Sequence, residues 1–179
     1  MTKSSPELAD GLMQGKIDVA LLRRETQTAG LTFKFLAKEP LLAILPARHR
    51  LARHRAVRPQ DLARESFIST ARVAPVLRAV IDDYAAKEGL TLKQNSDAET
   101  LSGGMSLVAS TGGFTLLPLY VRNALIPSVV ARPLRGEVPT IDLIMGYNNS
   151  NASPVLKKFL LRADELVQRV SQQQLALAP

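Results

Sequence analysis

The sequence predicts an α/β fold, and three observations support this class. Short apolar runs such as Ile17–Leu22 alternate along the chain with amphipathic segments such as Pro75–Lys87. The stretch Met105–Pro118 reads as one complete helix–strand unit: an apolar helix, the pair Gly112-Gly113, and a buried strand that stops at a proline. The spacing of strands and helices is regular, without internal repeats. We therefore expect largely parallel sheets covered by helices.

Composition excludes several classes of protein. The 179-residue chain is 46% apolar, which suits one domain or two small lobes with a sizeable core. It has no cysteine, and its two histidines lie in one loop, so we expect no metal, no cofactor and no thiol chemistry. No window approaches the length of a membrane span, and the N-terminus lacks the apolar core of a signal peptide. A cytoplasmic protein with no membrane partner is expected.

The net charge of +7 comes mainly from one stretch, residues 41–72, which holds seven arginines against two acidic residues. A DNA-binding patch is one interpretation of this stretch. We favour a solvated loop with its arginines facing water, because no recognition helix and no interleaved aromatic residues accompany the charges.

The N-terminal elements follow from capping signals and apolar runs. The first helix is expected to have Ser5 as its N-cap, with Pro6 at the first helical position and Glu7 favourable to the helix dipole. Gly15 ends this helix, and the buried strand Ile17–Leu22 follows. Two further strands are expected next, each running to a proline: Leu31–Ala37 and Leu41–Leu45.

The remaining elements follow from the same patterns. Pro75–Lys87 is expected to be a long amphipathic helix, and Thr100 can cap the helix that leads to Gly112. The other expected elements are two helices and four strands: a short helix Pro59–Ala63, the strands Phe67–Thr70, Leu90–Lys93, Val129–Pro133 and Ile141–Tyr147, and a C-terminal helix opened by Ser153-Pro154.

Hydroxyl groups gather at expected strand ends and helix starts. Ser69 and Thr70 end one strand, while Ser4, Ser5 and Thr100 precede or open helices. In α/β sheets, ligands bind at the carboxyl ends of strands beside helix N-termini, where free N–H groups and the helix dipole favour an anion. Each hydroxyl taken alone reads as an ordinary cap. Several around one cleft would form a carboxylate site.

Six segments carry a resemblance to a known family: Glu7–Leu22, Glu39–Ala52, Val57–Ala63, Phe67–Thr70, Leu107–Pro118 and Val129–Leu134. In this order and spacing they resemble the effector-binding domain of LysR-type transcriptional regulators. Phe67–Thr70 and the region Val130–Tyr147 are most similar to the branch that regulates aromatic-compound catabolism.

The resemblance implies two Rossmann-like α/β lobes of the type 2 periplasmic-binding-protein kind, with the effector in the cleft between them. Lobe one would comprise residues 1–39 and 139–179, and lobe two residues 40–138. Met105–Pro118 would belong to the core of lobe two. The implied function is the sensing of a small aromatic or dienoic carboxylate, which controls transcription through a quaternary change.

The family's effector contacts fall on three places in this sequence. They are the cap of the lobe-one helix at Ser5, the residue after the next strand, Arg23, and the strand-end loop from Ser69 to Ala74. A helix N-terminus and an arginine can together hold a carboxylate, and Ile68 is among the apolar residues that could cover a ring. With the neighbouring caps and apolar side chains, the candidate ligand-binding residues are Ser4, Ser5, Arg23, Ser69, Thr70, Arg72, Val73, Thr100 and Met145.

The sequence departs from the family pattern at its N-terminal side. Nothing in it corresponds to the winged helix-turn-helix and linker helix, or to the leading strand and helix of lobe one. We therefore expect lobe one to be incomplete at its N-terminus, the chain to be a fragment, and promoter DNA to be bound only through the missing N-terminal domain. Ile17–Leu22 would lack a sheet neighbour unless another copy supplied one. Self-association as a dimer or tetramer is expected from the family.

Two other functions are less well supported by the sequence. A solute-binding protein of the same fold would feed a transporter, but the chain shows neither a signal peptide nor a lipoprotein cysteine. An enzyme on this fold would need catalytic groups, and no nucleophile–base pair, carboxylate pair or metal cluster is visible. His49 and His54 lie in the basic loop. We therefore expect no enzymatic activity.

Overall fold

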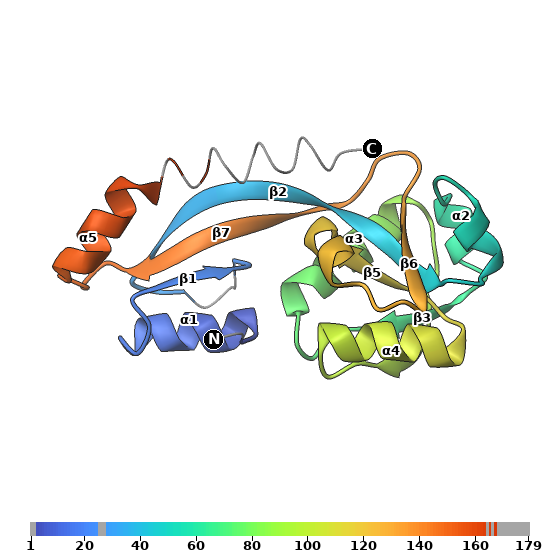
Figure 1. Cartoon of the computed structure of the whole chain (residues 1–179), viewed down its shortest axis with the longest axis horizontal. Helices are drawn as coiled ribbons and strands as arrows, with labels where there is room; N and C mark the ends of the chain where they lie inside the picture. Colours follow the sequence, from blue (N-terminus) through green and yellow to red (C-terminus); the bar gives the residue numbers. More distant parts are fainter. Residues whose placement is uncertain (1–2, 25–27, 164, 166, 168–179) are drawn as a thin grey trace. The chain divides into compact units, whose positions relative to one another are not determined.

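The computed structural model describes residues 3–24, 28–163, 165 and 167 (Figure 1). The chain divides into two compact units, unit 1 with Met1–Glu39 and Asp142–Pro179, and unit 2 with Pro40–Ile141. The chain passes from one unit to the other inside strand β2, Leu31–Pro46, and returns inside strand β7, Thr140–Asn148. Each unit combines helices with strands, as expected for the α/β class.

Unit 1 begins with helix α1, Ser5–Met13, whose N-cap is Ser4 rather than the predicted Ser5. The Glu7 carboxylate accepts hydrogen bonds from the Ser4 backbone N–H (2.9 Å) and from the Ser4 hydroxyl (2.7 Å). Ser4 and Glu7 have the spacing of a capping box, which fixes the helix start one residue earlier than the proline alone suggested. The hydroxyl of Ser5 is thereby left for another contact.

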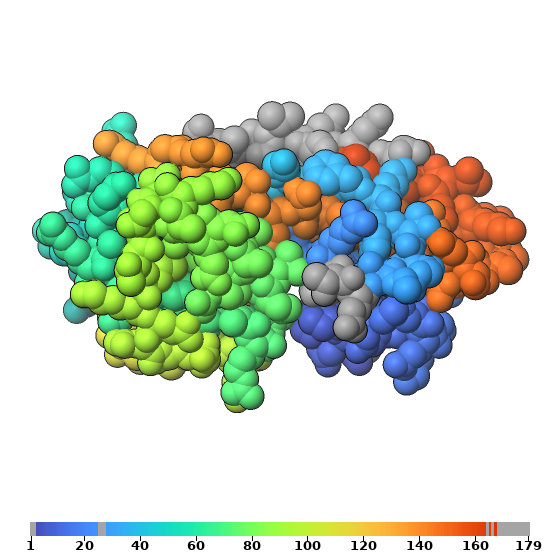
Figure 2. Space-filling view, turned by 180° about the vertical axis from the view of Figure 1, so that it is seen from behind, coloured from blue at the N-terminus to red at the C-terminus, as the bar shows by residue number. Residues whose placement is uncertain are grey.

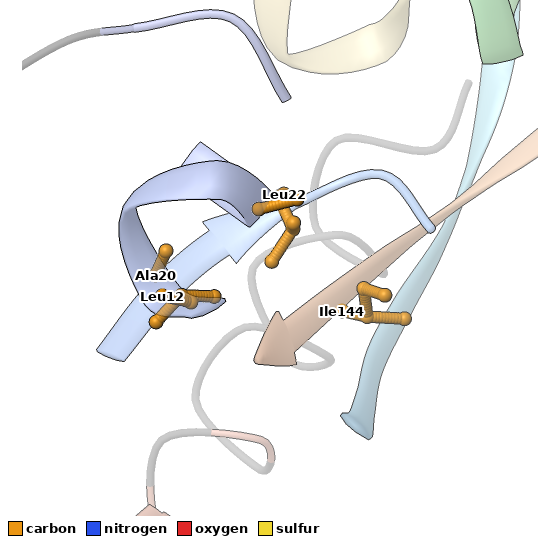
Figure 3. Packing of buried hydrophobic residues seen from close by; sticks show 5 residues of the cluster. Leu12, Ala20, Leu22 and Ile144 are labelled. Atoms are coloured by element: carbon orange, nitrogen blue, oxygen red, sulfur yellow. The ribbon is translucent and has the colours of Figure 1, made fainter. Parts of the chain in front are cut away.

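Strand β1, Val19–Leu22, pairs antiparallel with β7, with Val19 opposite Tyr147 and Leu22 opposite Ile144. The expectation that this strand would lack a sheet neighbour is therefore wrong. The chain folds back from unit 2 along β7 and supplies the neighbour itself. Helix α1 covers the pair, and its side chains form a core with those of both strands (Figure 3): Ala9, Leu12, Ala20, Leu22 and Ile144. Helix α5, Pro154–Leu161, completes the regular elements of unit 1 that the structure describes.

Strand β2 is one continuous strand, although two strands separated at Glu39-Pro40 were predicted. Proline fixes φ at a value that an extended strand tolerates, and it removes only one N–H from the ladder. The next residue, Leu41, donates its N–H to the carbonyl of Pro139 (2.9 Å), so the hydrogen bonding resumes at once. A proline therefore does not end this strand.

The sheet pairings of unit 2 are mixed rather than largely parallel. Strand β2 pairs antiparallel with β5, Thr115–Pro118, and also with β6, Val129–Pro133. Strand β3, Ser66–Ser69, runs parallel to β4, Lys93–Asp97. The parallel expectation is wrong for the pairs made by β1 and β2. Strand β2 enters unit 2 directly from unit 1. It does not arrive through a helical crossover, which is what makes neighbouring strands parallel.

The helical segments of unit 2 are the 3₁₀ turn η1, Arg50–Arg53, helix α2, Pro59–Leu62, helix α3, Pro75–Lys87, helix α4, Leu101–Thr111, and the 3₁₀ turn η2, Leu119–Ala124. Helix α3 has the predicted bounds. Helix α4 lies against β3 and β5 (Figure 1) and buries Met105 and Val108. Gly112 ends α4 with a φ of +80°, a conformation that glycine adopts without a Cβ penalty. The stretch Met105–Pro118 thus belongs to the core of unit 2.

The predicted cap of α4 is confirmed, because the Thr100 hydroxyl oxygen accepts a hydrogen bond from the Gly103 N–H at 2.9 Å. We expect Thr100→Ala to lower the free energy of unfolding by about 1 kcal/mol, since it leaves this N–H without its acceptor. Thr100→Ser keeps the hydroxyl and should differ from the wild type by about half of that or less. Urea unfolding of the three proteins measures both values. An equal loss in both variants would contradict the capping role.

Tyr84 of α3 provides a pH-dependent test of burial in unit 2. The residue is 5% exposed and lines a cavity of about 180 Å³ beside residues 137–140. Burial, and secondly the charge of Glu88, raise the pKa of its phenol from 10.0 to about 12. Because the folded pKa lies above the unfolded one, the stability that the neutral phenol contributes is complete below pH 10 and is lost as the pH rises from 10 toward 12.

An absorbance titration of phenolate measures this shift. The phenolate absorbance of the wild type minus that of Tyr84→Phe should stay constant near pH 10 and rise only around pH 12. The Tyr84 hydroxyl has no hydrogen-bond partner among the described residues, so Tyr84→Phe should not lower the melting temperature. A difference that rises near pH 10 would show that the phenol is hydrated in the folded protein.

Candidate functional site

In unit 2, the predicted polar strand end is formed by Ser69 and Thr70, which are 0% and 2% exposed. The Ser69 hydroxyl oxygen accepts two hydrogen bonds, from the Ala71 N–H (3.1 Å) and from Arg78 Nη1 (3.1 Å). These bonds occupy both lone pairs of the oxygen. The proton of the Ser69 hydroxyl is then available only as a donor, which suits an anionic acceptor.

Thr70 presents the second hydroxyl of this strand end. Its carbonyl accepts the N–H groups of Val73 (3.2 Å) and Ala74 (2.9 Å), which closes the turn that leads into α3. Its methyl group packs beside Gly104 of α4, where an added Cβ would lie 3.4 Å from Thr70 Cγ2. Its Oγ1 atom is buried and has no hydrogen-bond partner within the described part of the chain. A buried hydroxyl without a partner costs free energy, which a bound acceptor would recover.

The same turn leads into the N-terminus of α3, a 13-residue helix whose N-cap, Ala74, makes no side-chain cap bond. The first N–H groups of a helix have no partner within the helix. An uncapped helix start beside two hydroxyl groups is therefore a place where a carboxylate can accept several hydrogen bonds.

Arg78 of α3 is hydrogen-bonded to the Ser69 hydroxyl at the strand end. The sequence interpretation missed Arg78 as a residue of this site. Its Nε donates to both carboxylate oxygens of Asp82 (2.7 and 2.8 Å), and its Nη1 also donates to Oε1 of Gln94 (2.6 Å). Its guanidinium lies 5.8 Å from the centre of the Phe67 ring. The i,i+4 spacing of Arg78 and Asp82 was the one local signal. The contacts with Ser69 and Gln94 join residues far apart in the sequence.

In unit 1, Ser5 and Arg23 are brought together as a second polar group. The backbone N–H of Arg23 donates to the Ser5 hydroxyl oxygen at 3.0 Å. The Arg23 guanidinium forms an ion pair with Glu39, and the two side chains are only 13% and 6% exposed. The sequence interpretation missed Glu39 as a site residue, although it is the one carboxylate in β2. Arg23 therefore already holds a carboxylate of the protein, and a ligand carboxylate would have to share or replace it.

The other predicted site residues have different surroundings. Arg72 is exposed and lies 3.8 Å from the equally exposed Glu99, next to Thr100, so the turn after β3 and the cap of α4 are neighbours. Val73 is half-buried in that turn, and Ile68 is buried in β3. Ser4 caps α1 and Thr100 caps α4, as described above. Met145 is fully buried in the core of unit 1 with three residues: Leu36, Ala37 and Ala163.

The described residues show neither a cluster of metal ligands nor a helix that could cross a membrane. No group of three or more histidine, cysteine, aspartate or glutamate side chains there could hold a metal ion. Among the helices that the structure describes, none combines the length and apolar character needed to cross a membrane.

Comparison with known proteins identifies the family. Residues 1–167 match the LysR substrate binding domain family. The chain is 30% identical over 165 residues to the Hca operon transcriptional activator HcaR of Escherichia coli, covering 89% of this chain and 54% of HcaR. The chain spans about half the length of the curated relatives that it matches.

Two solved structures show the same fold. The effector binding domain of QuiR in complex with shikimate matches with a TM-score of 0.77 at 19% identity, over 95% of this chain and 79% of that domain's chain. The BenM effector binding domain with its effector benzoate matches with a TM-score of 0.76 at 17% identity, over 98% of this chain and 78% of that domain's chain. The fold is thus that of LysR effector-binding domains, which is periplasmic-binding-protein-like, and the resemblance seen in the sequence is confirmed. The chain belongs to the LysR substrate-binding domain family.

Proposed function

We propose that this chain is the effector-sensing domain of a LysR-type transcriptional regulator and binds a small aromatic or dienoic carboxylate. In this proposal unit 1 and unit 2 are lobes one and two of the domain. Unit 1 supplies Ser5 and Arg23, and unit 2 supplies Ser69, Thr70 and Arg72. The observation that carries the proposal is the polar strand end of unit 2, where two hydroxyl groups lie beside an uncapped helix start.

The chemistry of this strand end supports an anionic ligand. Ser69 can only donate, because Ala71 and Arg78 already occupy its lone pairs. The Thr70 hydroxyl has no hydrogen-bond partner among the residues that the structure describes. A carboxylate is an acceptor only, and hydrogen bonds to a charged group are worth about 1.5–3 kcal/mol each. A cationic ligand would leave both hydroxyl protons without acceptors.

The relatives support the chemical class of the ligand. QuiR was solved with shikimate and BenM with benzoate, and both molecules are six-membered rings that carry a carboxylate. Val73 beside the hydroxyl groups offers apolar surface for a ring. The similarity to HcaR and to CatR of Pseudomonas putida, which is 26% identical over 152 residues, supports a place in the branch that regulates aromatic-compound catabolism.

The effect on transcription follows from linkage. A ligand changes the balance between two quaternary states only by its differential affinity for them. We propose that the carboxylate does so in a dimer or tetramer, and that promoter DNA is contacted through the N-terminal domain of the regulator. The matched relatives are named as transcriptional regulators, which favours this role over a solute-binding protein for a transporter and over an enzyme.

A pair of matched variants tests the site. Thr70 and Thr115 are both buried in unit 2, and neither hydroxyl has a hydrogen-bond partner in the described part of the chain. Thr70→Val and Thr115→Val should therefore each leave the ligand-free protein as stable as before or slightly more stable. Thr70→Val should weaken carboxylate binding by about tenfold, because the proposed ligand accepts a hydrogen bond from this hydroxyl. Thr115→Val should leave the binding unchanged, because Thr115 is not a proposed contact.

The assay is a thermal-shift screen with benzoate, shikimate, cis,cis-muconate and aliphatic acids. A ligand at a hundred times its dissociation constant should stabilise the wild type by about 2.7 kcal/mol. The expected result is a selective shift with one cyclic or dienoic acid, reduced in Thr70→Val and retained in Thr115→Val. Equal shifts in both variants would exclude the strand end as the site.

A further inference from the structure

Unit 2 carries an arginine surface that the proposed function does not use. Its members lie in η1 and in the segments beside η1 and α2, and every one is exposed: Arg48, Arg50, Arg53, His54, Arg55, Arg58 and Arg64. Figure 2 shows this part of unit 2 in teal at the protein surface. The excess charge noted in the sequence is therefore presented to solvent.

The acidic residues of this segment neutralise only part of the charge. Asp61 accepts two hydrogen bonds from Arg58, at 3.0 and 3.1 Å, and this contact is the main cause that lowers the pKa of its carboxyl group. Glu65 pairs with Arg50 (2.5 Å) and contacts His49 (3.3 Å). The other arginines of the surface have no ion-pair partner within the described residues: Arg48, Arg53, Arg55 and Arg64.

The backbone that carries the arginine surface is anchored by buried side chains and by a hydrogen bond. Leu51 and Ala52, between the exposed arginines of η1, are buried, as are Val57 and Leu62 further along. The Ala52 carbonyl accepts a hydrogen bond from Arg132 Nε at 2.9 Å, which ties η1 to β6. The backbone that carries the arginines is therefore anchored in the core of unit 2, and binding would order side chains but not the loop itself.

We propose that the arginine surface binds the phosphate backbone of duplex DNA without sequence preference. Guanidinium groups match phosphate in charge and geometry. The segment from Arg48 to Glu65 contains no phenylalanine, tyrosine or tryptophan on which an unpaired base could stack. It also exposes no large hydrophobic side chain, which the core of a protein interface would need. Both features favour duplex DNA over single strands and over a protein partner.

This contact goes beyond the proposed function and does not depend on carboxylate binding. Reading of the operator sequence stays with the N-terminal domain of the regulator. The arginine surface would add a non-specific contact between the effector-sensing domain and DNA that lies beside it. Its contribution should be strongly salt-dependent, because each neutralised phosphate releases condensed counterions.

The test uses fluorescence anisotropy with this chain and a labelled 30-base-pair duplex of random sequence at low salt. Arg53→Glu/Arg55→Glu reverses two charges of the arginine surface. Lys157→Glu/Lys158→Glu makes the same charge change at two exposed residues of α5 in unit 1. Arg53→Lys/Arg55→Lys keeps the charge. Circular dichroism of each variant verifies that the fold is retained.

We expect the arginine reversal to weaken binding at least tenfold and to reduce the slope of log K against log salt by about 2. The lysine reversal should change affinity about twofold or less, and the arginine-to-lysine variant should retain binding. Equal losses in the two reversals would show that net charge alone attracts DNA and would overturn the proposal. Absence of binding by the wild type, or unchanged binding by the arginine reversal, would also overturn it.

Discussion

Replacement of Gly113 by alanine is expected to destabilise unit 2 by about 3–5 kcal/mol. A Cβ at this position would lie 2.5 Å from the backbone oxygen of Ser66, a contact that no side-chain movement can relieve. That oxygen accepts the N–H of Phe114 (2.8 Å), and the Phe114 carbonyl accepts the N–H of Ile68 (2.8 Å). A backbone shift would therefore break the bonds that join β3 to the start of β5.

The neighbouring glycine provides the control for this prediction. Gly112 has a φ of +80°, but an added Cβ there meets no atom within 4 Å. Gly112→Ala should therefore cost only the strain of the left-handed conformation, about 1 kcal/mol. Urea unfolding followed by circular dichroism gives both values. If Gly113→Ala lost no more stability than Gly112→Ala, the close approach of β3 to Phe114 would not exist in solution.

Removal of Arg23 is expected to have the second largest effect. Arg23 and Glu39 form an ion pair with little exposure, and Glu39 is 4% exposed overall. Arg23→Met leaves the Glu39 carboxylate buried without this partner, which costs about 3 kcal/mol or more. The double variant Arg23→Met/Glu39→Leu removes both charges and should recover most of that loss.

The exposed pair of Arg72 and Glu99 is the matched control, because its charges are 3.8 Å apart and well hydrated. Arg72→Met should change stability by about 0.5 kcal/mol or less. Chemical unfolding of the four proteins tests this ordering. A double variant as unstable as Arg23→Met alone would mean that the charges are not coupled.

Elements with local signals were predicted well. Helix α3 has a proline at its start and apolar residues at helical spacing, and β6 begins with three apolar residues and ends at a proline. Both have the predicted bounds. Thr100 and Gly112, which cap the two ends of α4, were predicted from residue type alone. In these cases the information lies within a few neighbouring residues.

Errors arose where distant contacts or competing local signals decide the structure. Two cap candidates, Ser4 and Ser5, stand side by side, and the carboxylate of Glu7 selects Ser4. Strand β4 begins at Lys93, so the predicted strand Leu90–Lys93 was placed too early. Strand β4 consists of polar residues whose side chains are mostly exposed, and it is held to β3 by backbone pairing. It therefore lacks the apolar pattern that marks a strand in a sequence.

In the candidate site, too, the local features were predicted from the sequence and the distant contacts were not. Ser69 and Thr70 were recognised as a polar strand end, which is a local pattern. The contacts that define their chemistry come from Arg78, nine residues further on, which occupies a lone pair of the Ser69 oxygen. Likewise the ion pair of Arg23 with Glu39 joins residues sixteen apart. No spacing rule predicts such pairs, because tertiary folding brings them together.

We propose that a carboxylate binds at the strand end of β3, where Ser69 and Thr70 lie. The most direct measurement is an NMR titration of the isotope-labelled chain with the acid that gives the largest thermal shift. We predict that the largest amide shifts fall on residues 69–74, 76 and 77. Shifts confined to other residues, or no saturable shift with any acid of the panel, would contradict the account.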